Sequence, residues 1–188
     1  MNPTQSEDPL VSYLLDLKRR DDRGALAELR SGLGKAPGEA PRMFPHVGRY
    51  LLSSDPSKPS VITAFVVASL FAKHPVHEAG RSLGKALALA TKRPGNPQGK
   101  HGEDGVAARF ARALDADPED LPRQLEGLIS LCESADKGID WYQFRGDVVA
   151  LLGEDHDQRD RVRLRWARDF WQSTPSSTQA TETQGTQS

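Results

Sequence analysis

Apolar residues recur along most of the chain roughly every three to four positions, the spacing of one face of an α-helix. This pattern predicts helices over residues 9–20, 21–34, 59–74, 77–93, 105–116, 118–135, 140–153 and 161–171. Three prolines interrupt residues 35–52, so we expect there a loop that leads into a short helix at most. No segment carries a strand signal. The sequence therefore predicts an all-α fold, either one helical bundle or two small helical lobes.

The helical pattern extends over residues 10–172, which we expect to form the folded domain. A Gly-, Pro- and Lys-rich stretch, "KRPGNPQGKHGEDG", carries no packing signal and predicts an exposed loop, with possible lobes at 10–93 and 104–172 on either side of it. Residues 1–9 are expected to be flexible. The tail at 173–188 is rich in Ser, Thr and Gln and is expected to be disordered.

Composition adds limits on location. Hydrophobic residues make up 37% of the chain and charged residues 27%, which is typical of a globular protein in water. The apolar run "VITAFVVASLFA" is too short to cross a bilayer, and the N-terminal residues lack the pattern of a signal peptide. Cys132 is the only cysteine, which excludes an internal disulfide and fits a reducing compartment. We therefore expect a cytoplasmic protein that makes no membrane contact.

Catalytic and metal-binding patterns are weak. Cys132 falls on the apolar face of its helix, so we expect it to pack in the core rather than act as a nucleophile. His74 and His77 have a metal-compatible spacing, but Pro75 between them favours the end of a helix. The acidic "EDHDQRD" is typical of the first turn of a helix. We predict no enzyme, no metal site and no cofactor.

Positive charge gathers locally although the net charge is only −1. In "GRSLGKALALATK", a helical projection places Arg81, Lys85 and Lys92 together, opposite the apolar face. Gly80 and Gly84 carry no side chain, so a backbone or a phosphate could approach closely. Such a face suits sequence-independent contact with a phosphate backbone.

Other helices carry basic residues as well. Arg109 and Arg112 form an i, i+3 pair that faces away from the apolar side of their helix. Arg30, Arg123 and Arg145 also lie on predicted helices, and each alone reads as an ordinary solvated charge. Acidic residues gather separately, in "DADPED" and "EDHDQRD", and this segregation favours a basic face.

The segment "RVRLRWARDFW" combines a basic face with an apolar one. Arg161, Arg165 and Arg168 share one side of the helix, which we expect to face outward. The opposite side holds Val162, Leu164, Trp166, Ala167, Phe170 and Trp171. Arg163 projects from the middle of this apolar side, so it needs a carboxylate or carbonyl partner. Trp141, Trp166 and Trp171 are expected in the core.

Six segments occur in a characteristic order: "DDRGALAELRSGLG", "SLGKALALA", "ARFARALDAD", "LPRQLEGLISL", "IDWYQFRGDVVALL" and "VRLRWARDFW". Between about Leu10 and Trp171 they resemble the CasB family, the small subunit of the type I-E CRISPR Cascade complex. The combination of "DRGALAELR", "SLGKALA" and "VRLRWARDF" is specific, whereas any one of them alone would be weak. The tail after Ser173 has no counterpart in this resemblance.

The resemblance implies a small all-α protein without catalytic activity. Two copies would lie head to tail beside the other Cascade subunits, and a basic face would contact the guide RNA and the target DNA, including the displaced strand of the R-loop. The matching motif positions assign this role to Arg30, Arg81, Lys85, Arg109 and Arg123 and, on a less specific match, to Arg112, Arg145 and Arg165. Lys92, Arg93 and Lys100 are candidates that the resemblance does not support. The alternative is a helical adaptor that binds only protein.

Overall fold

The computed structural model describes residues 8–91 and 99–173, with side chains from residue 105 onward in the second range. Its α-helices are α1 (Pro9–Arg19), α2 (Arg23–Arg30), α3 (Phe44–Val47), α4 (Pro59–Lys73), α5 (Leu83–Thr91), α6 (Gly99–Leu114), α7 (Leu121–Ser134), α8 (Trp141–Leu152) and α9 (His156–Ser173). Short 3₁₀ helices, Pro41–Met43 and Gly48–Tyr50, flank α3. The described ranges contain no strand, only an isolated bridge between His77 and Ile139. The predicted all-α fold is confirmed.

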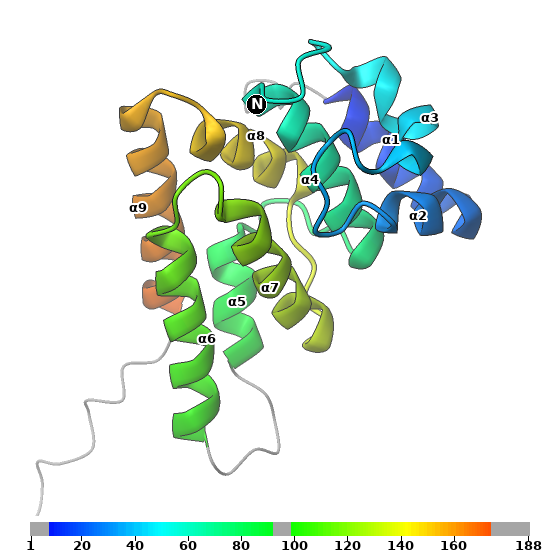
Figure 1. Ribbon diagram of the computed structural model, residues 1–188. Helices are drawn as coiled ribbons and strands as arrows, with labels where there is room; N and C mark the ends of the chain where they lie inside the picture. The colour runs from blue at the N-terminus through cyan, green and yellow to red at the C-terminus, as the bar shows by residue number, and fades with distance from the viewer. Residues whose placement is uncertain (1–7, 92–98, 174–188) are drawn as a thin grey trace, which may run out of the picture.

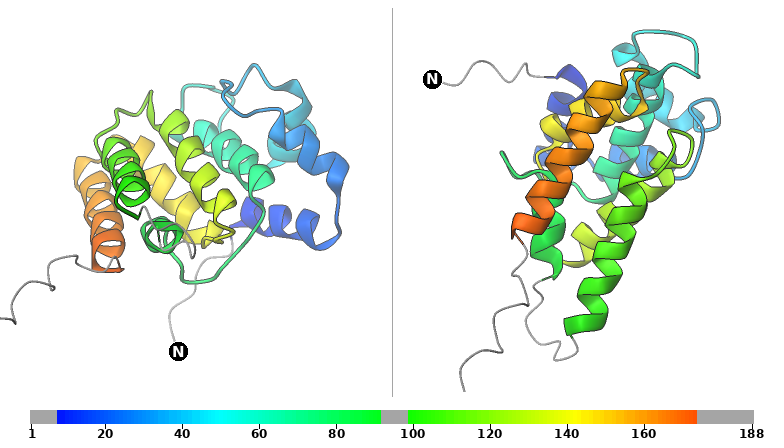
Figure 2. Two further views of the ribbon diagram at one scale, coloured as in Figure 1. Left: turned by 90° about the horizontal axis from the view of Figure 1, so that it is seen from below. Right: turned by 90° about the vertical axis from the view of Figure 1, so that its left-hand side faces the viewer.

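The helices form two groups that share one core (Figure 1). Helices α1 to α4 lie on one side, α5, α6, α7 and α9 on the other, and α8 runs between them. Seen from below, α6 and α9 stand at one end of the molecule and α2 at the other (Figure 2). Helix α8 packs against both α4 and α9, so it joins the two groups.

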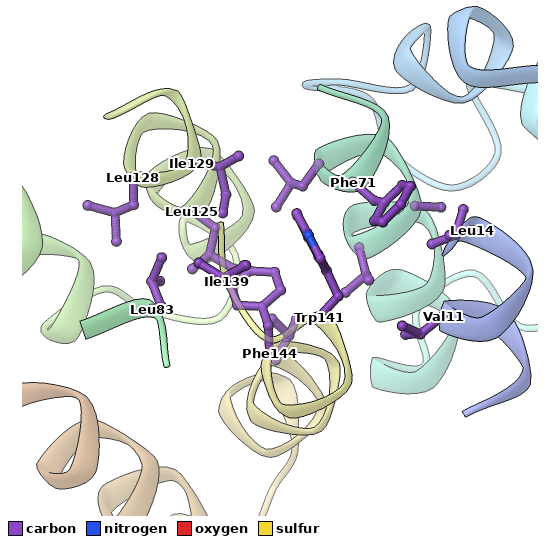
Figure 3. Packing of buried hydrophobic residues seen from close by; sticks show 14 of the residues in the cluster. Val11, Leu14, Phe71, Leu83, Leu125, Leu128, Ile129, Ile139, Trp141 and Phe144 are labelled. Atoms are coloured by element: carbon purple, nitrogen blue, oxygen red, sulfur yellow. The ribbon is translucent and has the colours of Figure 1, made fainter. Parts of the chain in front are cut away.

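Trp141, the first residue of α8, lies where the two groups meet (Figure 3). Its side chain is completely buried, and its ring centroid is 5.3 Å from those of Phe71 in α4 and Phe144 in α8. The indole N–H donates to the Val76 carbonyl at 3.1 Å, so the polar atom of this buried ring is satisfied. Leu125 and Ile129 of α7 approach from the other side (Figure 3). Apolar burial therefore runs continuously across both groups.

Local sequence signals explain most helix starts. Asp8 accepts hydrogen bonds from the N–H groups of Leu10 and Val11, and Asp22 accepts one from that of Ala25. Prolines stand in the first turns of α1 and α4, where a missing N–H has no cost. Helix α4 is buried nearly all round because it packs against α1, α2, α7 and α8. No described helix is long and apolar enough to cross a membrane.

Two predicted helix starts are wrong by six residues, those of α5 and α6. Helix α5 begins at Leu83 rather than near residue 77, because the backbone of the preceding segment pairs with Ile139 and Asp140 instead of forming a helix. The Glu78 N–H donates to the Ile139 carbonyl at 2.9 Å, and Gly80 adopts a left-handed φ of 73°. Helix α6 begins at Gly99, within the stretch expected to be a loop. The expectations for residues 1–7, 92–98 and 174–188, Lys92 and Arg93 among them, lie outside the described residues, as does the Lys100 side chain.

Candidate nucleic-acid interface

The turn before α5 is clamped by the loop before α8. Asp140 is almost fully buried, and its carboxylate accepts from the Gly80 N–H at 2.8 Å and caps α8 through the N–H groups of Tyr142 and Gln143. The Asp140 N–H in turn donates to the Arg81 carbonyl at 2.7 Å. Hydrogen bonds to Asp140 therefore fix the backbone at Gly80 and Arg81. Arg81 itself precedes α5 rather than lying within it.

Helix α5 packs unusually close to α9. A Cβ atom at Gly84 would lie only 2.4 Å from the Trp166 carbonyl oxygen, so only glycine fits between the two backbones. The close backbone approach expected at this glycine is thus confirmed. Because Gly84 is buried against α9, the Gly84 side of α5 is closed to a phosphate.

Arg81 and Lys85 line one hollow on the outer side of α5. The hollow has a volume of about 290 Å³, and Leu89 and Ser173 also border it. Lys85 is exposed and has no ion-pair partner among the described side chains. Arg81 makes one long contact, 3.6 Å from its guanidinium to the half-exposed Glu78 carboxylate. The expected grouping of Arg81 with Lys85 is present.

Arg109 and Arg112 lie on the outer side of α6, which packs against α5 and α7. Both are exposed, whereas Phe110 and Ala113 between and beside them are buried. Neither arginine forms an ion pair with an acidic side chain in the described part of the chain. Together with Lys85, they are cations without an acidic partner among the described side chains.

Arg145 and Arg165 are held inside the fold by ion pairs. The Arg145 guanidinium lies 2.7 Å from Asp8, and both side chains keep only about a fifth of their surface in water. Arg165 pairs with Asp147, a carboxylate that is 8% exposed. The prediction that Arg165 lies on the outer face is therefore wrong. A helical projection gives the direction of Cβ, not the reach of a long side chain to an acid on the next helix.

Asp147 joins α8 to α9. Besides Arg165, it accepts a hydrogen bond of 2.6 Å from the indole N–H of the buried Trp166. Burial raises the pKa of the Asp147 carboxyl, and the hydrogen bonds from Arg165 and Trp166 partly oppose that rise. The Arg165 charge therefore offsets the cost of placing this carboxylate between two packed helices.

Three further arginines contact the fold itself. Arg163 donates to the Ala116 carbonyl at 3.0 Å, which confirms that it needs a partner within the apolar side of α9. Arg30 is exposed, but its Nε donates to the Ala72 carbonyl near the end of α4 at 3.0 Å. Arg123 is exposed and forms an exposed pair with Asp120 at 3.1 Å. Exposed pairs stabilise little, so Arg123 can exchange its partner for a phosphate.

The outer part of α9 differs from the helical projection. Leu164 is 71% exposed and Trp171 is 48% exposed, so the expectation that both pack in the core is wrong. Trp171 contacts the buried Phe110 and Phe170, at ring-centroid distances of 5.7 and 5.0 Å, but keeps about half of its own surface in water. Trp141 and Trp166 are in the core as expected. Helix α9 buries a narrower stripe because only α5 and α8 pack extensively on it.

One basic residue at α5 was not among the candidates. Arg168 is 61% exposed, and its guanidinium lies 3.5 Å from the Asp169 carboxylate, which also accepts a 2.6 Å hydrogen bond from the Ser82 hydroxyl. Arg168 therefore lies beside the first turn of α5. The sequence carries one signal for this contact, because Asp169 falls on the same apolar face as Trp166 and Phe170. A buried carboxylate needs a polar partner, which here is Ser82.

The residues with possible metal or redox chemistry serve the core. Cys132 is fully buried, and burial raises the pKa of its thiol to about 12, as its predicted place on the apolar face requires. His74 is buried, and its Nε2 hydrogen bonds to the Lys137 carbonyl at 2.9 Å. His77 Nδ1 accepts from the Trp141 N–H at 3.3 Å. The described side chains include no group of three or more potential metal ligands.

Comparison with known proteins identifies the family. The family model described as CRISPR-associated protein Cse2 matches residues 25–171, most of the folded region. The chain belongs to the Cse2 family. A CRISPR-associated protein Cse2 from Thermus thermophilus is 28% identical over 148 residues, 78% of each chain. The resemblance stated from the motifs is confirmed.

Solved structures of Cse2 relatives share the arrangement of helices. A Cse2-family protein of Thermus thermophilus has a TM-score of 0.68 at 27% identity, covering 88% of this chain and 99% of that one. CasB from M. ruber has a TM-score of 0.65 at 28% identity, covering 87% and 91%. A chain of a structure named CRISPR RNA-guided surveillance complex has a TM-score of 0.66 at 23% identity, covering 88% and 91%, and supports the fold alone.

Proposed function

We propose that this Cse2-family chain is the non-catalytic small subunit of a type I-E CRISPR Cascade complex. The observation that carries the proposal is the family match over residues 25–171. A chain of similar fold belongs to a structure named as an RNA-guided surveillance complex, which fits a role inside such an assembly. Its partners would be the other Cascade subunits, a second copy of this chain, the guide RNA and the target DNA.

The proposed role is to hold nucleic acid and stabilise the R-loop, including its displaced strand. Lys85, Arg109 and Arg112 support this role because they are exposed cations without acidic partners among the described side chains. Arg81 and Arg123 are paired only with partly exposed acids, and phosphate can replace such partners. Contacts of this kind position a strand without reading its sequence, which suits a subunit that meets any target.

The eight candidate residues divide under this proposal. Arg30 and Arg123 can contact a strand while keeping a local partner. Arg145 and Arg165 form ion pairs with Asp8 and Asp147, so we assign them to stabilising the fold that carries the interface. The contact surface proper consists of Arg81, Lys85, Arg109 and Arg112.

A helical adaptor that binds only protein is the second candidate, and one observation favours it. An apolar groove of about 450 Å³ lies between the loop after α2, helix α4 and the start of α7. Leu33, Ile62, Phe65, Val66 and Pro122 line it, and Lys35, Glu119, Arg123 and Glu126 border it. A groove of this kind suits a protein segment better than a phosphate backbone.

A salt titration of target-DNA binding distinguishes the two functions. The complex would be reconstituted with guide RNA and either the wild-type chain or the double variant Arg81→Ala, Lys85→Ala. Each lost phosphate contact should flatten the slope of log K against log salt by about 0.7–0.9. The matched control removes Arg19 and Arg23, two exposed arginines of α1 and α2, which lie in the other group of helices from α5 (Figure 1).

Complexes with the control variant should keep the wild-type slope. If the double variant also keeps the wild-type slope and affinity while assembling normally, α5 is not part of the nucleic-acid surface. The adaptor would then be the better account. Failure of the wild-type chain to assemble with Cascade subunits would refute the proposed function as a whole.

A further inference from the structure

The Asp169 carboxylate contacts two polar groups where α5 packs against α9. One carboxylate oxygen accepts from the Ser82 hydroxyl at 2.6 Å, in a hydrogen bond that is fully buried. The other oxygen lies 3.5 Å from the Arg168 guanidinium, which is largely exposed. Ser82 also accepts from the Lys85 N–H at 3.3 Å and so caps the first turn of α5. The Asp169 carboxylate thus contacts the residue that caps α5 and a cation of its own helix, α9.

The position of Asp169 is fixed by packing. A Cβ atom at Gly84 would lie 3.2 Å from the Asp169 Cβ, so this side chain fills the space that the glycine leaves. Asp169 is 9% exposed and Ser82 is 3% exposed. Neither group can turn toward water without opening the contact between α5 and α9.

We infer that Asp169 is a positioning residue for the basic surface, and that Arg168 belongs to this surface together with Arg81 and Lys85. Asp169 sets the first turn of α5 through Ser82, which fixes the direction of Lys85 and of the adjacent Arg81. It also holds Arg168 beside that turn. Cations from two helices then meet one stretch of phosphate backbone. This inference rests on the proposed function, because it concerns how the same surface is assembled.

A carboxylate within a basic surface normally weakens phosphate binding, because it repels the same anion. Asp169 would be unfavourable if charge were its only effect. A positioning role predicts the opposite sign, because ordering the cations reduces the entropy lost on binding. The two accounts differ in whether removal of this negative charge strengthens or weakens binding.

The substitution Asp169→Asn tests that sign in the assembled complex. It removes one negative charge, retains an oxygen that can accept from Ser82, and removes the attraction for Arg168. Positioning predicts weaker target-DNA binding than wild type at every salt concentration. Asp157→Asn is the matched control, because it removes the same charge from the exposed first turn of the same helix. The control should bind as well as wild type or slightly better.

If Asp169→Asn binds target DNA as tightly as Asp157→Asn, the positioning role is refuted. A melting curve of each variant separates this result from loss of fold. Weaker binding supports the inference only where the melting temperature and the assembly of the complex are retained. If Asp169→Asn melts lower and assembles poorly, its part is structural and the inference falls.

Arg168→Gln tests the added contact directly. We expect the salt slope to flatten by about 0.7–0.9, as for one lost phosphate contact. Arg161→Gln is the control: it lies on the same face of α9 and is exposed, but stands two turns, about 10 Å, nearer the start of the helix. It should keep the wild-type slope. A slope change with Arg81→Ala, Lys85→Ala but none with Arg168→Gln would refute the contact and leave the proposed function intact.

Discussion

Two basic residues of α5 and α6 differ from two of α8 and α9 in what surrounds their charges. Lys85 and Arg112 face water without an acidic partner among the described side chains, whereas Arg145 and Arg165 each pair with a carboxylate that is mostly buried. Lys85 and Arg112 can therefore bind an anion of another molecule without breaking an internal ion pair. Arg145 and Arg165 cannot do so without leaving the carboxylate of Asp8 or Asp147 unpaired. Basic residues are thus available for binding in one region and serve stability in the other.

Arg165→Ala should give the largest loss of stability among the basic residues. It leaves the Asp147 carboxylate buried with only the Trp166 indole as a donor. Breaking a buried pair from one side costs about 3–5 kcal/mol, and the lower end applies here because Arg165 itself is partly exposed. Urea unfolding at neutral pH measures the change. Arg161→Ala, an exposed change on the same helix, should stay within about 0.5 kcal/mol of wild type.

The loss caused by Arg165→Ala should shrink as the pH falls. Burial already raises the pKa of Asp147 above its ordinary value of 3.8, and removing Arg165 raises this pKa further. A folded state that binds a proton more tightly than the unfolded chain gains stability as the pH falls through its raised pKa. Unfolding at a series of pH values should therefore show the variant approaching wild type in acid. A constant difference would mean that the charge of Asp147 is not the cause.

Gly84→Ala should cause the next largest loss of stability. Gly84 lies where α5 packs against α9, so this variant probes the contact between the two regions. The new methyl group would meet the Trp166 carbonyl at 2.4 Å, and a backbone atom cannot turn aside. Overpacking of this kind costs about 1–3 kcal/mol. Gly127→Ala in α7 has no atom within 4 Å of the added group and should be neutral or stabilising by up to about 1 kcal/mol. Thermal melts that rank the two variants in reverse would contradict the close α5–α9 contact.

Arg145→Ala should lower stability less, by about 1.5 kcal/mol, because Asp8 keeps its two hydrogen bonds to the start of α1. If the charge serves only the fold, the salt slope of target-DNA binding should not change. Urea unfolding and the salt titration measure these two effects separately. A flatter slope with unchanged stability would move Arg145 to the contact surface.

The sequence predicted what depends on local periodicity. The all-α class, the start of α4 at Pro59 and the burial of Cys132 each follow from residues within one helix. Exposure of Lys85 and Arg112 was also predicted, because it requires only that the opposite face be apolar. For these residues, the position on the helix alone determines whether the side chain is buried or exposed.

Partners from distant segments were not predicted. Asp147 stands 18 positions before Arg165, and nothing in either helix marks the pair. Residues 77–82 have a helical composition, but their backbone bonds to Ile139 and Asp140 instead, so the true start of α5 depends on tertiary contact. The exposure of Arg168 was predicted, but its place beside α5 was not, since this depends on Asp169 and Ser82 together.

The smallest effect on stability is expected for Lys85→Ala combined with Arg112→Ala. Both residues are exposed, and neither has an ion-pair partner among the described side chains, so each change should stay within about 0.5 kcal/mol. The same double variant should nevertheless flatten the salt slope of target-DNA binding by about 0.7–0.9 for each phosphate contact that is lost. Arg145→Ala is expected to show the reverse combination, lower stability with an unchanged slope. Measuring unfolding and binding on both variants tests whether binding and stability depend on different basic residues. A stability loss above about 1 kcal/mol in the double variant would show that these cations also support the fold.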